Sequence, residues 1–259
     1  MKFLKVILLF SLVGCATEID FYVPAQRFQT PETNGAGGKF DFSVGQTKSQ
    51  KISTARVSDP VLFGNNVTLD TATEFNHEKH IATTFSVGLG SQFDIFALGY
   101  LDGPSYYGFK FQLLGNSGTK KSDGLKLAVT GSFAYMEEEG NTTKVTVNNN
   151  SREYESTLDV QGYDASVILG YRFNPGFIAY VSGGYSQLSS ESVLTSNQFD
   201  TVNIKGDVLM TSGTFGIKVG GNNKIKTFAC LEATYNKVEF KGALADEKTS
   251  IGGVLGYSF

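Results

Sequence analysis

The sequence has no long apolar run after residue 14 and so offers no membrane-spanning helix in the mature chain, since such a helix needs about 20 apolar residues. Proline and cysteine are scarce, at 5 and 2 residues, whereas Gly, Tyr and Phe number 30, 12 and 21. The net charge is only −3, which argues against a nucleic-acid partner, because such proteins carry a basic patch. Few prolines with many glycines and aromatic residues are typical of one domain built from many strands and tight turns.

The first 14 residues have the pattern of a signal peptide. Two lysines precede the apolar run 6–13, which is too short to cross a membrane. The run ends in Leu12-Val13-Gly14-Cys15, which resembles the lipobox of bacterial lipoproteins. The resemblance implies cleavage before Cys15, acylation of Cys15 with palmitate-type chains and, because Ala16 follows, export to the outer membrane. The alternative is an ordinary signal peptide with a chance cysteine. An acylated Cys15 leaves Cys230 without a disulfide partner.

The last nine residues alternate like a membrane-facing strand. Ile251, Leu255, Tyr257 and Phe259 fall on one face, and the chain ends on this aromatic residue. Chain ends of soluble domains usually fray into water, whereas a transmembrane β-barrel places aromatic residues at the membrane interface. This ending resembles the C-terminal strand of bacterial outer-membrane proteins. The resemblance implies that Tyr257 and Phe259 belong to the signal read by the barrel-assembly machinery.

Strand-like runs of the length needed to span a membrane recur along the rest of the chain. We expect ten, at 39–47, 79–90, 92–101, 105–115, 124–136, 157–173, 176–188, 206–220, 225–239 and 248–259. The connections between them mostly alternate between short and long, which is the pattern of short periplasmic turns and longer surface loops. The predicted fold is therefore an all-β, antiparallel, up-and-down transmembrane barrel of about ten strands, within a range of 8–12.

The predicted organisation has three parts. Residues 1–14 form the lipoprotein signal peptide, 15–38 a lipid-anchored and irregular tether rich in Pro and Gly, and 39–259 the outer-membrane barrel. An even strand number places both termini in the periplasm. The polar segments 137–156 and 189–205 are expected as surface loops, and the tight Asn174-Pro175 turn is expected on the periplasmic side.

Side-chain alternation predicts a lipid face and a lumen face for each strand. When the odd positions of the last strand face lipid, the opposite face of the barrel collects eight charges, at Asp41, Asp94, Lys110, Lys126, Asp164, Arg172, Lys218 and Glu232. A charge facing lipid at the membrane centre costs about 2–4 kcal/mol for Arg or Lys, so these side chains belong in the lumen. A narrow barrel is filled by side chains, and we therefore expect an ion-pair network, unless several of the charges reach water at strand ends.

No catalytic or metal-binding constellation stands out, and the sequence predicts neither an enzyme nor a cofactor. His77-Glu78-Lys79-His80 holds two histidines with the wrong spacing for HExxH, and it leads into a strand instead of lying on a helix. Exposed loop histidines are the simpler interpretation, and no metal site is predicted. Glu137-Glu138-Glu139 is interpreted as a solvated loop.

In its architecture and its terminal strand, the chain is similar to the small OmpA-like or opacity-type outer-membrane barrels. It differs from the usual member in its lipobox, because those barrels carry no lipid. The resemblance implies a bacterial outer-membrane location and contact with outer-membrane lipids, lipopolysaccharide, and the barrel-assembly and lipoprotein-export machineries. The first functional hypothesis is a non-enzymatic barrel lipoprotein with a structural or surface-contact role. A narrow channel or small-ligand transporter is the second hypothesis. A lipid-anchored soluble β-sandwich or lipocalin-like binder is the third.

Overall fold

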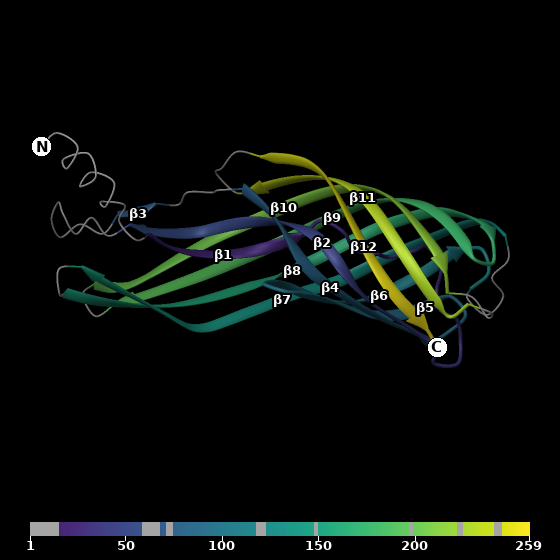
Figure 1. The fold of residues 1–259 in the computed structure, drawn as a ribbon, viewed down its shortest axis with the longest axis horizontal. Helices are drawn as coiled ribbons and strands as arrows, with labels where there is room; N and C mark the ends of the chain where they lie inside the picture. The colour runs from purple at the N-terminus through teal and green to yellow at the C-terminus, as the bar shows by residue number, and fades with distance from the viewer. Residues whose placement is uncertain are drawn as a thin grey trace, which may run out of the picture.

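The computed structural model describes residues 16–58, 68–70, 75–117, 123–147, 150–196, 199–221, 225–240 and 245–259, and its described part is all-β. Ten strands form a closed antiparallel barrel (Figure 1). They are β2 (Phe40–Ser58), β4 (Phe75–Gly88), β5 (Phe93–Tyr100), β6 (Gly103–Leu114), β7 (Gly124–Val147), β8 (Asn150–Asn174), β9 (Phe177–Ser196), β10 (Phe199–Gly220), β11 (Thr227–Phe240) and β12 (Asp246–Ser258). Two further strands, β1 (Ala16–Pro24) and β3 (Thr68–Asp70), pair only with β2. Within the described residues, no helix has the length and hydropathy to cross a membrane.

The first and last wall strands meet to close the barrel. β2 pairs with β12 from Asp41 to Gln46, and its other edge pairs with β4 from Phe40 to Ile52. At the foot of this seam the N–H of Phe259 donates to the carbonyl oxygen of Phe40 at 2.9 Å, and their rings stack at 4.2 Å. The predicted up-and-down barrel of about ten strands is confirmed.

The wall is much taller on one side than on the other. β7, β8, β9 and β10 have 20 to 25 residues each, whereas β5 has 8. The prediction of polar loops at 137–156 and 189–205 is therefore wrong, because most of these residues continue the strands, with Val147 opposite Asn150 in the register. Alternating β-branched residues such as those of Thr143–Val147 favour strand over loop. The tips at 148–149 and 197–198 lie outside the described residues.

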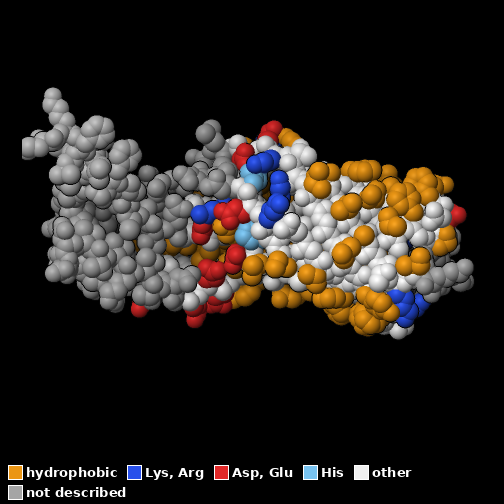
Figure 2. Space-filling model, viewed as in Figure 1, with side chains coloured by type: hydrophobic (Ala, Val, Ile, Leu, Met, Phe, Trp, Pro, Cys, Tyr) orange, Lys and Arg blue, Asp and Glu red, His pale blue; other side chains and the backbone are white. Residues whose placement is uncertain are grey.

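Apolar side chains cover the visible face of the barrel at the end that carries the C-terminus (Figure 2), and exposed apolar residues on all ten wall strands make this a belt. Leu255 and Ile251 are 72% and 68% exposed, and the expected outward residues of the other strands are mostly exposed as well. On β5, the apolar Phe96, Leu98 and Tyr100 point inward with Asp94. The predicted lipid-facing side is confirmed. A closed wall with an apolar exterior and a charged interior defines a transmembrane β-barrel of the outer-membrane class.

Beyond the belt the interior is a packed apolar core. Ile19, Phe21 and Val23 of β1 are buried there together with Ile52 of β2. The rest of this cluster comes largely from the tall wall, and includes Leu158, Val160, Leu188, Leu194, Val208, Met210 and Val238. β1 also meets the short β5–β6 turn, where the N–H of Tyr22 donates to the carbonyl oxygen of Asp102 at 3.1 Å. Polar side chains occupy the interior nearer the C-terminus.

The two ends of the described chain lie at opposite ends of the barrel. Ala16 pairs with Ser58, at the end of β2 farthest from Phe40, while Phe259 bonds to Phe40 itself. The prediction of an irregular tether is therefore wrong for residues 16–24. The prediction that both ends of the chain lie on the same side of the barrel does not hold for Ala16 and Phe259. Residues 16–24 form a strand instead, because alternating apolar residues find an interior core to pack against.

Candidate functional site

The most distinctive feature of the barrel is a chain segment inside it. We call residues 25–34, which follow β1, the internal strap; eight of these ten residues are buried, and Arg27 and Asn34 are half-buried. The strap begins where β12 no longer pairs with β2, and there the N–H of Ala25 donates to the carbonyl oxygen of Lys48 at 3.0 Å. The side chain of Gln26 bonds to Thr47 and to Ser250 at 2.7 Å each. The strap thus joins both strands at the upper end of the seam and continues into the lumen.

Side chains of the wall accept the backbone N–H groups of the strap. Glu232 accepts from Arg27 and Phe28 at 3.2 and 3.0 Å, Gln112 from Thr33 at 3.0 Å, and Asp94 from Asn34 at 2.9 and 3.0 Å. Buried N–H groups without a strand partner need such acceptors. The bonds to Glu232 also hold a tight bend, because Phe28 has a positive φ of 53°. Three inward polar side chains of the wall therefore act as hydrogen-bond acceptors for the strap backbone.

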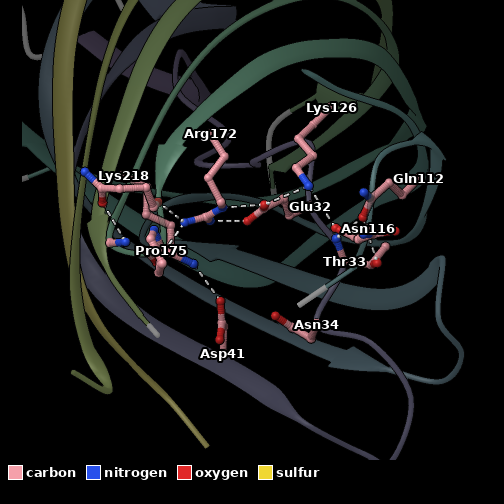
Figure 3. A network of polar contacts seen from close by, with 12 residues as sticks. Glu32, Thr33, Asn34, Asp41, Gln112, Asn116, Lys126, Arg172, Pro175 and Lys218 are labelled. Atoms are coloured by element: carbon pink, nitrogen blue, oxygen red, sulfur yellow. Dashed lines mark hydrogen bonds and ion pairs between the residues drawn. The ribbon is translucent and has the colours of Figure 1, made fainter. Parts of the chain in front are cut away.

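The strap also carries two charges that neutralise charges of the wall. Arg27 lies 3.1 Å from Asp164 and places its guanidinium over the ring of Tyr106 at 4.5 Å. Glu32 bonds to Arg172, with one Nε–Oε1 distance of 2.5 Å, and lies 3.8 Å from Lys126 (Figure 3). In both places a strap side chain carries the charge opposite to that of the wall side chains beside it.

The eight predicted lumen charges all lie inside the barrel. Two pairs form within the wall: Asp94 with Lys110 at 3.5 Å, and Asp41 with Lys218 at 2.7 Å. Asp164, Arg172, Lys126 and Glu232 instead contact the strap. With Arg27 and Glu32 added, these ten side chains comprise five cations and five anions. Sequence reasoning missed both strap charges, because nothing in the pattern of residues 25–34 distinguishes a lumen segment from a tether.

Glycines of the wall make room for the strap and for Gly35, the residue that follows it. A Cβ atom on Gly88 would lie 1.9 Å from the carbonyl oxygen of Gly35, and one on Gly170 would lie 2.8 Å from Pro31. A Cβ on Gly252 would lie 2.8 Å from the side-chain oxygen of Gln26. These glycines of the wall are thus places of close approach, and they are the sequence signal that could have indicated an occupied lumen.

Replacing one of these glycines tests the fit of the strap. Gly88→Ala is expected to lower the free energy of unfolding by about 1–3 kcal/mol, the usual cost of overpacking, because the added Cβ meets backbone atoms of Gly35. Denaturant midpoints in detergent micelles measure the change. Gly183→Ala is the matched control, since a Cβ there has no neighbour within 4 Å. Equal midpoints for the two variants would contradict the close approach.

The remaining predicted residues lie apart from the strap. Tyr257 and Phe259 are aromatic neighbours at 4.5 Å at the foot of the seam. His77 bonds to Asp246 at 2.9 Å, while His80 lies 3.7 Å from Asp102, so the two histidines have different partners. The described residues contain no group of three His, Cys, Asp or Glu side chains arranged to hold a metal ion. Cys15 lies outside the described residues.

No protein-family model matches the sequence, and no curated protein sequence matches it either. Among solved structures, the outer membrane protease OmpT from Escherichia coli aligns with 96% of this chain and 98% of its own, at 11% identity and a TM-score of 0.32. The prediction that the protein is not an enzyme is not kept beside this match, which is to a protein named as a protease. At this identity and score the likeness carries no activity over to the present chain, and the prediction of a non-enzymatic role is withdrawn.

Proposed function

We propose that the protein is a sealed outer-membrane barrel that holds a surface-contact structure outside the membrane and does not pass solutes. The single observation behind this proposal is the internal strap, which bonds to opposite parts of the wall through Glu232, Asp164, Arg172 and Asp94. Ten strands enclose slightly more space than side chains alone fill, and the strap occupies that space. Planar-bilayer recording of the refolded protein tests the seal, and we expect no stable open steps.

The tall wall supports the surface-contact part of the proposal. β7, β8, β9 and β10 continue well beyond the belt, and residues of their inner face pack in the apolar core around β1. The turns at the opposite end are short, as at 175–176 between β8 and β9. Because outer-membrane barrels have short periplasmic turns, we place the C-terminus in the periplasm and the extension outside.

Labelling on intact cells tests this orientation. A tag at Asn149, between the ends of β7 and β8, should bind antibody on intact cells, whereas a tag at Asn174 should bind only after the outer membrane is opened. A third tag placed before Thr17 should behave like the first, because Ala16 pairs with Ser58 at the same end. The reverse pattern would invert the orientation, and equal access to all three would favour a soluble, lipid-anchored protein.

We also propose that Cys15 is acylated. The lipobox residues support this, and Ala16, the residue after Cys15, lies at the end of the barrel opposite Phe259. Incorporation of labelled palmitate should be lost in Cys15→Ser, while the barrel should still insert, because its apolar belt is independent of Cys15. A wild-type chain that takes up no label would contradict the proposal, and Cys230→Ser, which removes a buried cysteine, is the control.

A further inference from the structure

Three lysines gather on the wall just beyond the apolar belt. Lys48 on β2 and Lys79 on β4 lie directly opposite each other in the strand register. Lys248 on β12 is exposed and close enough for its charge to act on His77, as does that of Lys48. Figure 2 shows Lys or Arg side chains beside the two histidines, past the edge of the belt. We call Lys48, Lys79 and Lys248 the lysine cluster.

The lysine cluster has no acidic counterpart of its own. No ion pair joins its three members to any residue that the structure describes, whereas Lys51, Lys205 and Lys237 each pair with a carboxylate. The acids next to the cluster already accept hydrogen bonds: Asp246 from Gln50 and His77, Glu78 from Tyr22, and Glu247 from Tyr235. Like charges directly opposite each other destabilise a strand pair, so an anion from outside the chain would stabilise this part of the wall.

The positive charges of the cluster also affect the pKa of His77. Burial lowers the pKa of His77, and the charges of Lys248 and Lys48 lower it further, while its bond to Asp246 acts in the opposite direction. The geometry is independent of this effect, since the register alone fixes Lys48 opposite Lys79.

The height of the lysine cluster on the wall indicates where an anion would come from. Lys79 lies two residues from Ile81 on β4, and Ile81 is a belt residue that is 54% exposed. Lys48 lies four residues from Val44, another belt residue, with Gln46 between them. At about 3.3 Å per strand residue, the ammonium groups lie within reach of the polar headgroups that border the hydrocarbon.

We infer that the lysine cluster binds the phosphate groups of a phosphorylated lipid of the outer leaflet. The belt directly below it, at Ile81 and Val44, would contact the acyl chains of the same molecule. A free phosphate would satisfy the charges but not the apolar surface, and for this reason we assign the anion to a lipid. The assignment to the outer leaflet rests on the proposed orientation, with the extension outside, but not on the sealed lumen or on acylation of Cys15.

Lipid retention by the folded barrel tests this inference. The delipidated protein in detergent is titrated with a bisphosphorylated glycolipid, and bound lipid is counted by native mass spectrometry. The variant K48Q/K79Q/K248Q should bind roughly 100-fold more weakly than the wild type, because each lysine beside an anionic lipid surface contributes about fivefold. K39Q/K205Q/K226Q removes the same charge elsewhere and should bind like the wild type. The arginine variant K48R/K79R/K248R should keep the affinity.

Two comparisons identify the source of the anion. The dephosphorylated glycolipid should bind the wild type about as weakly as the phosphorylated lipid binds the glutamine variant, and inorganic phosphate should compete only at far higher concentration than the lipid. Equal binding of the phosphorylated lipid by both triple glutamine variants would overturn the inference. So would equal competition by inorganic phosphate, which would show an anion site without a lipid. A shift in gel mobility on boiling shows that each variant is folded.

Discussion

Glu32→Gln is expected to lower the free energy of unfolding by about 3–5 kcal/mol, the usual cost of removing one partner from a buried ion pair. Glu32 is the only strap residue that neutralises Arg172 and Lys126, both almost fully buried. After the substitution Arg172 keeps its bonds to the carbonyl oxygens of Asn174 and Pro175, and Lys126 keeps its bond to that of Asn116. Two buried cations then lie together without an ion-pair partner among the described residues, although the charge of Asp123 still acts on Lys126.

Urea midpoints in detergent micelles, read by gel mobility, measure this effect. Glu155→Gln, which removes an exposed carboxylate from β8, is the matched control and should change stability by less than about 0.5 kcal/mol. The double variant Glu32→Gln/Arg172→Gln should lose less stability than the sum of the two single variants, because the second change removes one of the unpaired cations. A wild-type midpoint for Glu32→Gln would show that the strap does not occupy the lumen.

The sequence predicts the wall of this barrel well because successive side chains of a strand point to opposite faces, so that the lipid-facing and lumen-facing positions alternate. Phe109 and Lys110 illustrate this: the first is 50% exposed on the lipid side and the second is buried beside Asp94. A membrane-facing charge is costly, so the position of a lysine decides the facing of its whole strand. The tall wall was partly missed because polar residues outside the membrane carry no such penalty and look like loops.

The strap could not be predicted because its ion pairs are long-range and its residues follow no period. Arg27 meets Asp164 and Glu32 meets Arg172, at separations of 137 and 140 residues. Pro31 and the glycines after it resemble a flexible linker by composition alone. The equal numbers of wall cations and anions suggested a self-neutralising lumen, but their positions do not match, since Lys126 and Arg172 lie together and depend on Glu32.

Removing the strap is expected to open the lumen. The intact protein should show no stable steps in planar bilayers, whereas a chain that lacks residues 16–34 should show discrete open steps. With the strap absent, Arg172, Lys126, Asp164 and Glu232 lose their partners on the strap and keep only hydrogen bonds to the wall. Water then enters the lumen, because buried charges require either a counter-charge or solvent. The same deletion removes β1 and the apolar residues it contributes to the core.

A second variant separates an open lumen from a failure to fold. A protease site placed at the exposed residues 36–38 leaves the folded chain complete until it is cut between the strap and β2. This site is combined with Glu32→Gln, which removes the ion pairs to Arg172 and Lys126. Cleavage should then release the end of the strap that lies next to the cut, and conductance steps should be seen only after protease is added. The uncut protein is its own control. A closed lumen after both changes would mean that the wall side chains fill the barrel without the strap.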